Sequence, residues 1–220
     1  MKGKFISFEG PDGAGKTTQV KKLAEYLMYA GYDVVVTREP GGTPISDQIR
    51  GLILSPDHQE MADQAEVLLY AASRAQHVHE LILPALEEGK IVISDRYIDA
   101  SVAYQAYGLG IDLDAVISIN RFASSGLQPD RTYMLDLSVE ASRERLQSRT
   151  AGNGMQGLDR IEQKGAAYHQ RVREGFHRIA ARETERIVVI DADRTAEEMA
   201  KQIIGDCEQF FKPFPMRNAL

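Results

Sequence analysis

Five short stretches of the chain are predominantly apolar, and much longer segments separate them. They cover residues 4–8, 33–37, 90–94, 131–137 and 186–190. Strands that are buried on both faces of a parallel sheet have this continuous apolar pattern. The segments between the stretches are long enough for helices that connect one strand to the next. The pattern predicts an α/β fold with a five-stranded parallel sheet and helices on both of its faces.

Apolar residues with helical spacing follow the first two predicted strands. One set is Val20, Leu23, Ala24 and Leu27, and the other is Ile45, Ile49, Leu52 and Ile53. Intervals of three and four residues place each set on one face of a helix. The chain has no internal repeat and no linker, which favours a single domain over residues 1–211. We expect a lid at about residues 149–160, where glycine is frequent, and a loose tail at residues 212–220.

Composition and charge argue against several classes of protein. The 220 residues include 26 Lys and Arg against 32 Asp and Glu, a net charge of -6, so we expect no nucleic-acid partner and no membrane partner. The single cysteine, Cys207, has no second thiol for a disulfide or a zinc cluster. The chain begins directly with a predicted strand, and no apolar run approaches the ~20 residues of a membrane-spanning helix. We therefore expect a cytoplasmic protein.

The segment between the first predicted strand and the first predicted helix has the composition of a phosphate-binding loop. Residues 8–18 read FEGPDGAGKTT and contain the pattern GxxxxGKT. Glycines let backbone N–H groups approach a phosphate chain, and the start of the helix adds partial positive charge. The Lys16 ammonium group can bridge the terminal phosphates, and the Thr17 hydroxyl can ligate Mg²⁺. We expect phosphate binding by Gly10, Pro11, Asp12, Gly13, Ala14, Gly15, Lys16, Thr17 and Thr18.

Polar residues follow two of the predicted strands directly. Arg38 and Glu39 come after the second strand, and Asp95 and Arg96 come after the third. Ligands of parallel sheets bind at the carboxyl ends of the strands, so these side chains can meet the phosphate loop. A simple salt bridge at the sheet edge is the alternative explanation for each pair taken alone. Their convergence on one phosphate loop favours a ligand site.

Five motifs of the chain occur in the order and spacing found in bacterial thymidylate kinases, and the chain therefore resembles that family. They are FEGPDGAGKTT, TREPGGT, LLYAASRAQH, SDRYIDASVAYQ and LDRIEQ, and the resemblance extends over residues 3–210. It implies the P-loop nucleoside monophosphate kinase fold, with Mg²⁺ as cofactor, ATP as phosphate donor and dTMP as acceptor. It also implies a homodimer that makes dTDP and ADP in dTTP synthesis.

The resemblance also implies roles for individual residues. Thr17 and Asp95 would organise Mg²⁺, while Lys16, Asp95 and Arg96 would be catalytic. Arg38 and Arg96 would hold the phosphate of dTMP, and Asp12 would lie near the sugar 3′-hydroxyl. The residues expected around dTMP are Asp12, Arg38, Glu39, Arg50, Tyr70, Arg74, Arg96, Ser101, Tyr104 and Gln105, with Arg50 the weakest candidate.

The phosphate loop contains no arginine, so a further cation for the transferred phosphoryl group must come from elsewhere. Arg145 and Arg149 lie four residues apart on the helix that enters the predicted lid, and Arg160 follows the glycine-rich stretch. The chain resembles the thymidylate kinase subtype whose catalytic arginine lies in the lid. Arg149 and Arg160 are both candidates, and resemblance to related kinases offers Arg145 as the residue that stacks on adenine. The alternative is that all three are solvated helix charges.

Two pairs of residues predict how the base is recognised. Tyr70 and Arg74 lie four residues apart, and so do Ser101 and Gln105. That spacing lets each pair face one pocket. Arg74 only donates hydrogen bonds, which suits the thymine O4, and the Gln105 amide can pair with the N3 and O4 edge. Tyr70 can stack on the base, although a helical tyrosine taken alone fits the core as well. By the family's pattern, Tyr104 lies against C2′ of the sugar.

Two other functions share some of these features. A kinase for a different nucleoside monophosphate or small acceptor would need the same phosphate loop. A nucleotide-driven switch would need it too, but the chain lacks the NKxD motif that recognises guanine. A switch would also have no use for the two arginine-containing segments after the second and third predicted strands, which are expected to bind an acceptor. The five histidines have no metal-ligand spacing, and no GxSxG motif is present.

Overall fold

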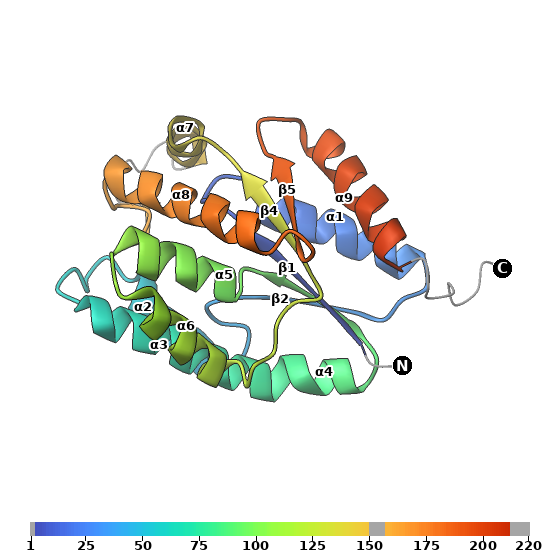
Figure 1. Cartoon of the computed structure of the whole chain (residues 1–220), viewed down its shortest axis with the longest axis horizontal. Coiled ribbons are helices and arrows are strands. Elements are labelled where there is room, and N and C mark those ends of the chain that lie inside the picture. Colours follow the sequence, from blue (N-terminus) through green and yellow to red (C-terminus); the bar gives the residue numbers. More distant parts are fainter. Residues whose placement is uncertain (1–2, 150–156, 212–220) are drawn as a thin grey trace.

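Five parallel strands form the centre of the molecule (Figure 1). The computed structural model describes residues 3–149 and 157–211. The strands lie in the order β2-β3-β1-β4-β5 and pair in parallel throughout. They are β1 (Lys4–Glu9), β2 (Val34–Arg38), β3 (Ile91–Asp95), β4 (Arg131–Asp136) and β5 (Ile187–Asp191). The predicted α/β class and all five predicted strands are confirmed.

Two predicted segments fall partly or wholly outside the described residues. Residues 150–156 make up most of the predicted lid, and residues 212–220 are the predicted tail. The division of the chain into a domain over residues 1–211, a lid and a tail therefore stays a prediction.

Helices α1 and α9 cover one face of the sheet. α1 (Lys16–Tyr29) follows β1, and α9 (Ala196–Phe211) follows β5. The four apolar residues that predict α1 are all buried, in one cluster with Ile6 and Phe8 of β1. Cys207 of α9 is buried in the same cluster, so the single thiol belongs to the core.

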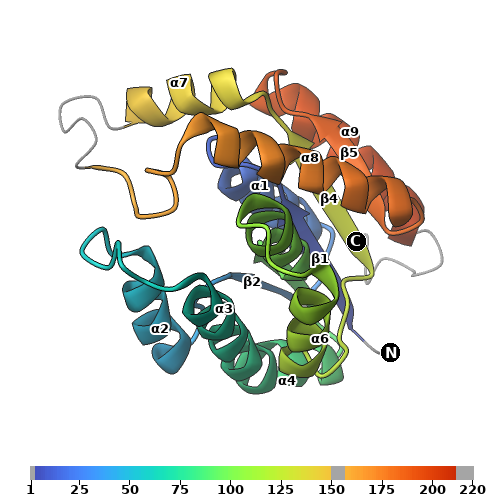
Figure 2. The ribbon, with the colours of Figure 1, turned by 60° about the vertical axis from the view of Figure 1, so that its left-hand side comes forward.

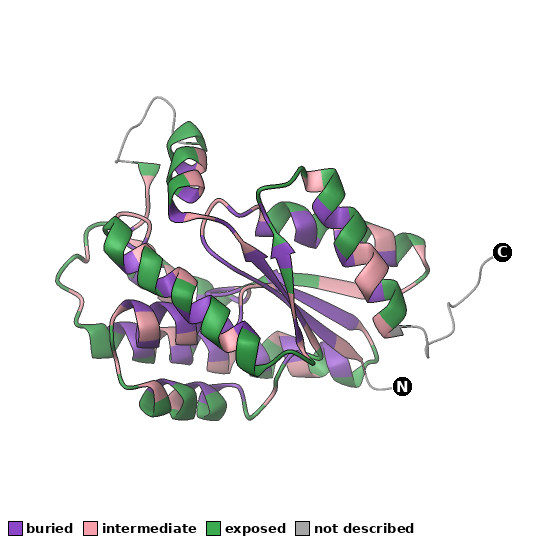
Figure 3. Ribbon diagram, turned by 45° about the horizontal axis from the view of Figure 1, so that its top comes forward, coloured by how far each residue is buried: buried purple, intermediate pink, exposed green. Residues whose placement is uncertain are grey.

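The other helices lie on the opposite face of the sheet or beside it (Figures 1 and 2). They are α2 (Pro44–Leu54), α3 (Asp63–His77), α4 (Leu83–Glu87), α5 (Ile98–Ser101), α6 (Leu113–Ala123) and α8 (Ala166–Arg182), with π-helical segments η1 (Val78–Ile82) and η2 (Val102–Gly108) and, beyond the tips of the strands, α7 (Val139–Arg149). Successive strand side chains point to opposite faces, so Phe5 packs with η1 and α4 while Ile6 packs with α1. Buried residues concentrate in the sheet and on the helix faces turned towards it (Figure 3). None of the helices in the described ranges has the length and apolar character needed to cross a membrane.

The carboxyl ends of β1, β2 and β3 meet at one edge of the sheet. Phe8 of β1 and Arg38 of β2 are both in register with Asp95 of β3. β1 has β3 on one side and β4 on the other, so the strand order changes direction there. Ligands of such sheets bind at this switch point. The register therefore brings the phosphate loop next to Arg38 and Asp95.

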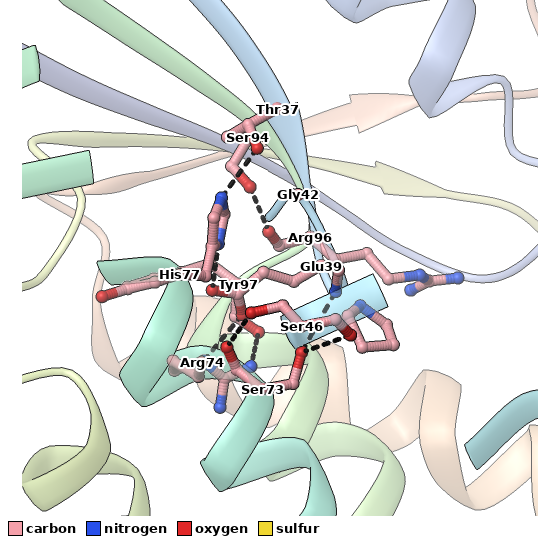
Figure 4. A network of polar contacts seen from close by, with 12 residues as sticks. Thr37, Glu39, Gly42, Ser46, Ser73, Arg74, His77, Ser94, Arg96 and Tyr97 are labelled. Carbon is pink, nitrogen blue, oxygen red and sulfur yellow. Dashed lines mark hydrogen bonds and ion pairs between the residues drawn. The ribbon is translucent and has the colours of Figure 1, made fainter. Parts of the chain in front are cut away.

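The turn after β2 is packed so tightly that one of its positions requires glycine. Gly42 has φ 96°, in the left-handed region. A Cβ atom on Gly42 would lie 2.6 Å from Thr37 Oγ1 and 2.7 Å from His77 Nε2. Those two atoms are hydrogen-bonded at 2.7 Å, and His77 Nδ1 lies 3.0 Å from Glu39 Oε1 (Figure 4). The turn that carries Arg38 and Glu39 therefore rests on a buried polar network.

We predict that Gly42→Ala lowers the free energy of unfolding by ~1–3 kcal/mol, because backbone strain adds to displacement of the bond between Thr37 and His77. Gly51→Ala is the matched control. Gly51 lies within α2, and nothing lies within 4 Å of the position of an added Cβ. This substitution should raise stability by up to ~1 kcal/mol through helix propensity. Urea denaturation measures both changes, and equal effects of the two substitutions would contradict the tight turn.

Candidate active site

A cavity of about 510 Å³ lies at the carboxyl ends of the strands. Its walls come from the phosphate loop, the ends of β2 and β3, helices α2, α3, α5 and α7, segment η2, and residues Asp159, Ile161 and Glu162. The predicted site residues that line it are Asp12, Gly13, Gly15, Lys16, Thr17, Thr18, Arg38, Glu39, Arg50, Tyr70, Arg74, Asp95, Arg96, Ser101, Tyr104, Gln105, Arg145 and Arg149. Within the described part of the chain, Gly10, Pro11, Ala14 and Arg160 do not line it. One cavity thus joins the predicted phosphate loop to the predicted base pocket.

Glycines shape the phosphate loop, and Lys16 is folded back into it. Gly10, Gly13 and Gly15 have φ values of 127°, 77° and 89°, which side-chain-bearing residues rarely adopt. Lys16 Nζ donates hydrogen bonds to the carbonyl oxygens of Gly10 at 3.0 Å and Pro11 at 2.7 Å. Burial lowers the pKa of Lys16 to about 8. An anionic group beside Nζ would favour the protonated form again.

Thr17 and Asp95 present two oxygen atoms next to the loop. Thr17 Oγ1 donates a hydrogen bond to Asp95 Oδ2 at 2.6 Å. Hydroxyl and carboxylate oxygens suit Mg²⁺, which usually takes few protein ligands and completes its shell with water and phosphate oxygens. No group of three or more His, Cys, Asp or Glu side chains in residues 3–149 and 157–211 could hold a metal. The pair therefore fits a Mg²⁺ ion that binds together with a nucleotide.

Arg96 connects the phosphate loop to the opposite side of the cavity. Its Nη1 donates to the Gly10 carbonyl at 2.9 Å, and its Nη2 lies 2.6 Å from Asp12 Oδ1. Tyr104 Oη donates to Asp12 Oδ2 at 3.1 Å. Burial alone would raise the pKa of Asp12, but Arg96 and Lys16 hold it well below its usual range. Arg96 itself has φ 74°, and such strained residues cluster at functional sites.

Two further arginines border the cavity near the end of β2. Arg38 Nη2 lies 2.9 Å from Asp47 Oδ1, and both side chains are about half exposed. Arg50 Nη1 donates to the Pro40 carbonyl at 2.8 Å. Burial and the positive charge of Arg38 lower the pKa of Arg50. With Arg96, these side chains make a cationic region suited to a phosphate group.

Arg74 is buried in a network of acceptors. Its Nε donates to Glu39 Oε2 at 2.7 Å, and its Nη2 donates to the Tyr97 carbonyl at 3.1 Å (Figure 4). Its Nη1 donates to Ser101 Oγ at 3.0 Å and also to Asn120 Oδ1. These bonds use four of the five guanidinium hydrogens. Recognition of the thymine O4 by Arg74 stays a prediction, and it would depend on the one remaining N–H group.

The residues predicted around the base, together with Tyr104 at the sugar, lie on α3, α5 and η2. The Tyr104 ring packs edge-on against Phe176 of α8, with centroids 6.0 Å apart. Gln105 Nε2 donates to Glu66 Oε1 at 3.1 Å. Gln105 Oε1 is buried and has no hydrogen-bond partner among the described residues. Tyr70 lines the same cavity and is half-buried.

Arg145 and Arg149 reach the cavity from α7. Arg145 donates to the Gly13 carbonyl at 3.3 Å and to the Ala192 carbonyl at 3.0 Å. Arg149 Nη2 lies 2.6 Å from Glu162 Oε1, and the arginine side chain is 57% exposed. The Arg145 side chain is 38% exposed, so both arginines have room to turn towards a ligand.

Arg160, the second candidate for the lid cation, is buried elsewhere. Its Nε donates to the Ile53 carbonyl at 2.8 Å, and its Nη2 lies 2.7 Å from Glu66 Oε2. The side chain is only 4% exposed. Of the two candidates, the described part of the structure therefore brings Arg149 to the cavity and holds Arg160 away from it.

Several acidic residues near the site were missed by sequence reasoning. Burial and the nearby Asp99 raise the pKa of Glu9 to about 8, and its position at the end of an apolar strand was a signal. Asp159 lines the cavity, and burial raises its pKa to about 6. Glu66 and Glu162 resemble ordinary surface charges in the sequence, and only their burial in the folded chain distinguishes them.

Comparisons with known proteins identify one family. The family model described as thymidylate kinase matches residues 8–203. The thymidylate kinase of Exiguobacterium sibiricum is 54% identical over 212 residues, which cover 96% of this chain and 97% of the relative. That of Halothermothrix orenii is 50% identical, over 92% of this chain and 95% of the relative.

A solved structure shows the same architecture. The crystal structure of thymidylate kinase from Ehrlichia chaffeensis superposes with a TM-score of 0.74 and 33% identity, over 94% of this chain and 99% of that chain. The chain belongs to the thymidylate kinase family.

Proposed function

We propose that the cavity binds its two substrates on two sides. The phosphate donor binds at the phosphate loop, which we call the donor side, and the phosphate acceptor binds between Arg96 and η2, which we call the acceptor side. The chain phosphorylates dTMP to dTDP, and ATP supplies the phosphate. One observation carries this division: Arg96 contacts Gly10 and Asp12 in the loop and also lies 3.3 Å from Tyr104 Oη on η2. Phosphoryl transfer depends mainly on positioning and charge neutralisation, and a cation at this junction serves both.

On the donor side, we assign Lys16 to the terminal phosphates of ATP. Its Nζ donates to two loop carbonyls, and a small rotation would let it reach a phosphate held by the same loop. Thr17 and Asp95 would hold Mg²⁺, which neutralises phosphate charge when it is bound. The N-terminus of α1 directs backbone N–H groups to the same place. Arg145, next to the Gly13 carbonyl, is assigned to the adenine end.

On the acceptor side, we assign Arg38, Arg50 and Arg96 to the phosphate of dTMP, because these cations border one part of the cavity. The base would lie between Tyr70 and η2. Its edge would meet Gln105, whose Oε1 has no partner within the described ranges, and the free N–H group of Arg74. Tyr104 would contact the sugar.

We assign the lid cation to Arg149, which places the chain in the lid-arginine subtype. Arg149 lines the cavity, and its only ion pair is with Glu162 within the described residues. The Arg149 side chain is 57% exposed, so it can turn towards a ligand, and Glu162 would still accept a hydrogen bond from the backbone N–H of Asp159 at 3.1 Å. Arg160 could reach the phosphates only by breaking a buried pair with Glu66, which is far more costly.

A homodimer through α2, α3 and α6 is also proposed. These helices lie side by side, with α3 between α2 and α6 (Figure 2). Large apolar side chains are exposed on them, namely Ile45, Leu52, Leu68, Ile117 and Phe122. Phe122 is 87% exposed, and covering it by a second copy would remove apolar surface from water. The homodimer and the cytoplasmic compartment expected from the sequence both stay proposals.

We predict that the wild-type enzyme phosphorylates dTMP fastest, dUMP more slowly, and dCMP and purine monophosphates near background. The methyl group that separates dTMP from dUMP is worth only ~1–3 kcal/mol in an apolar pocket. Cytosine would place its amino group against the donor of Arg74 and leave buried polar groups unpaired. A coupled ADP-release assay with ATP and Mg²⁺ measures the order. Faster turnover of CMP or AMP than of dTMP would favour a kinase for another acceptor.

Lys16→Ala should lose most activity, ~10²-fold or more in kcat, because its charge stabilises the transferring phosphoryl group. Its circular dichroism spectrum should stay that of the wild type. Lys21→Ala, on the exposed side of the same helix, is the control and should keep normal turnover. Near wild-type turnover of Lys16→Ala would rule out the donor assignment.

Arg149→Ala should lower kcat much more than it raises the KM for dTMP, because a lid cation acts mainly in the transition state. We expect a loss of ~10²-fold or more, within the range for arginines of this kind. Arg143→Ala, on the same helix and exposed, controls for the loss of surface charge. If the Arg149 and Arg143 variants have the same kcat, Arg149 is not the lid cation.

A further inference from the structure

We propose that Glu66 determines which base the cavity accepts, by fixing the orientation of the Gln105 amide. The proposal rests on the function assigned above and names a positioning residue behind the base pocket. Glu66 lies on α3, its side chain is 1% exposed, and it acts through Gln105 rather than by touching the substrate.

Glu66 holds Gln105 by its nitrogen atom. Gln105 Nε2 donates to Glu66 Oε1 at 3.1 Å. A carboxylate only accepts hydrogen bonds, and an amide nitrogen only donates them. If the amide turned by 180°, its oxygen would face the carboxylate, and two buried acceptors would meet with no hydrogen between them. Glu66 therefore excludes one of the two orientations that an unrestrained glutamine could adopt.

This orientation leaves a buried acceptor at the cavity. Gln105 lines the cavity, and its Oε1 has no hydrogen-bond partner in residues 3–149 and 157–211. Buried polar atoms are normally paired, so an orphan at a ligand cavity points to a partner on the ligand. That partner must be a donor. N3 of thymine or uracil carries a hydrogen and can donate, whereas N3 of cytosine can only accept.

Two cations keep Glu66 in the accepting role. Arg160 Nη2 lies 2.7 Å from Glu66 Oε2, and Lys164 Nζ lies 3.8 Å from the same oxygen. Arg160 is itself fixed by the Ile53 carbonyl at 2.8 Å. Arg160 is the last residue of the predicted lid and Lys164 follows it, so this part of the chain supports the base pocket through Glu66.

A purely structural role for Glu66 gives a different expectation. If Glu66 only linked α3 to residues 160–164 through a buried ion pair, its substitution would lower the stability of the protein and leave the base preference unchanged. A carboxylate that orients Gln105 would affect the choice between bases. The ratio of kcat/KM for dTMP to kcat/KM for dCMP separates the two roles, because a general loss of stability lowers both values together.

The decisive variant is Glu66→Gln. A neutral amide at position 66 can accept or donate, so Gln105 becomes free to turn. In the turned orientation Gln105 would donate to N3 of cytosine and accept from its amino group. We expect the dTMP to dCMP ratio to fall about tenfold or more, through slower use of dTMP and faster use of dCMP. The ratio of the dissociation constants, from titration calorimetry, should fall in parallel.

Asp99→Asn is the matched control. Asp99 forms a buried pair with Arg186 at 2.7 Å, and neither residue lines the cavity within the described part of the chain. This variant loses one charge from a comparable buried pair. It should keep the wild-type ratio of kcat/KM for dTMP to kcat/KM for dCMP. If Glu66→Gln does not fold because Arg160 is left unpaired, the double variant Glu66→Gln/Arg160→Gln removes both charges and permits the same measurement.

A lower ratio in the Glu66 variant, with an unchanged ratio in the Asp99 variant, would support the proposal. An unchanged ratio in the Glu66 variant, or an equal fall in both variants, would overturn it and leave the kinase assignment intact. A wild-type enzyme that does not prefer dTMP would instead overturn the assignment of the base pocket itself.

Discussion

The contacts of the Arg96 guanidinium hold the two sides of the cavity in a fixed relation. Arg96 follows β3, yet it bonds to Gly10 and Asp12 in the loop that follows β1. The parallel register of the two strands makes these bonds possible, because it aligns Phe8 with Asp95. The positive φ of Arg96 is unfavourable for a side-chain-bearing residue, by ~1–3 kcal/mol, and the bonds to the loop compensate for it. The phosphate loop and the η2 side of the cavity therefore share one rigid junction.

The side of the cavity formed by α3 depends on buried charges that are held in pairs. Arg74 is paired with Glu39, which also contacts His77, and Arg160 is paired with Glu66. Such pairs add little net stability compared with apolar residues, but the loss of one partner is costly. Their main effect is to fix the positions of the charged side chains, because each buried charge can satisfy its hydrogen bonds in only a few arrangements. Side chains at the cavity are thereby held before any substrate binds.

The parts that sequence reasoning predicted well are those with local causes. Buried parallel strands are apolar along their whole length, so all five could be recognised from short stretches. The phosphate loop depends on the conformational freedom of Gly10, Gly13 and Gly15 and on the helix that follows. Helical spacing brought Tyr70 and Arg74 to one cavity. Each of these inferences needs only neighbouring residues.

By itself, the sequence determined the sheet, the phosphate loop and most of the side chains that surround the cavity. Only the tertiary structure decided what several of those side chains do. Arg160 and Glu66 are 94 residues apart, and Arg74 and Asn120 are 46 apart, so their pairing has no local signal. A charged residue on a helix looks solvated until the fold buries it, and burial then forces it to find a partner. The hydrogen-bond partners of these arginines, and the orientation of Gln105, are consequences of packing between distant segments.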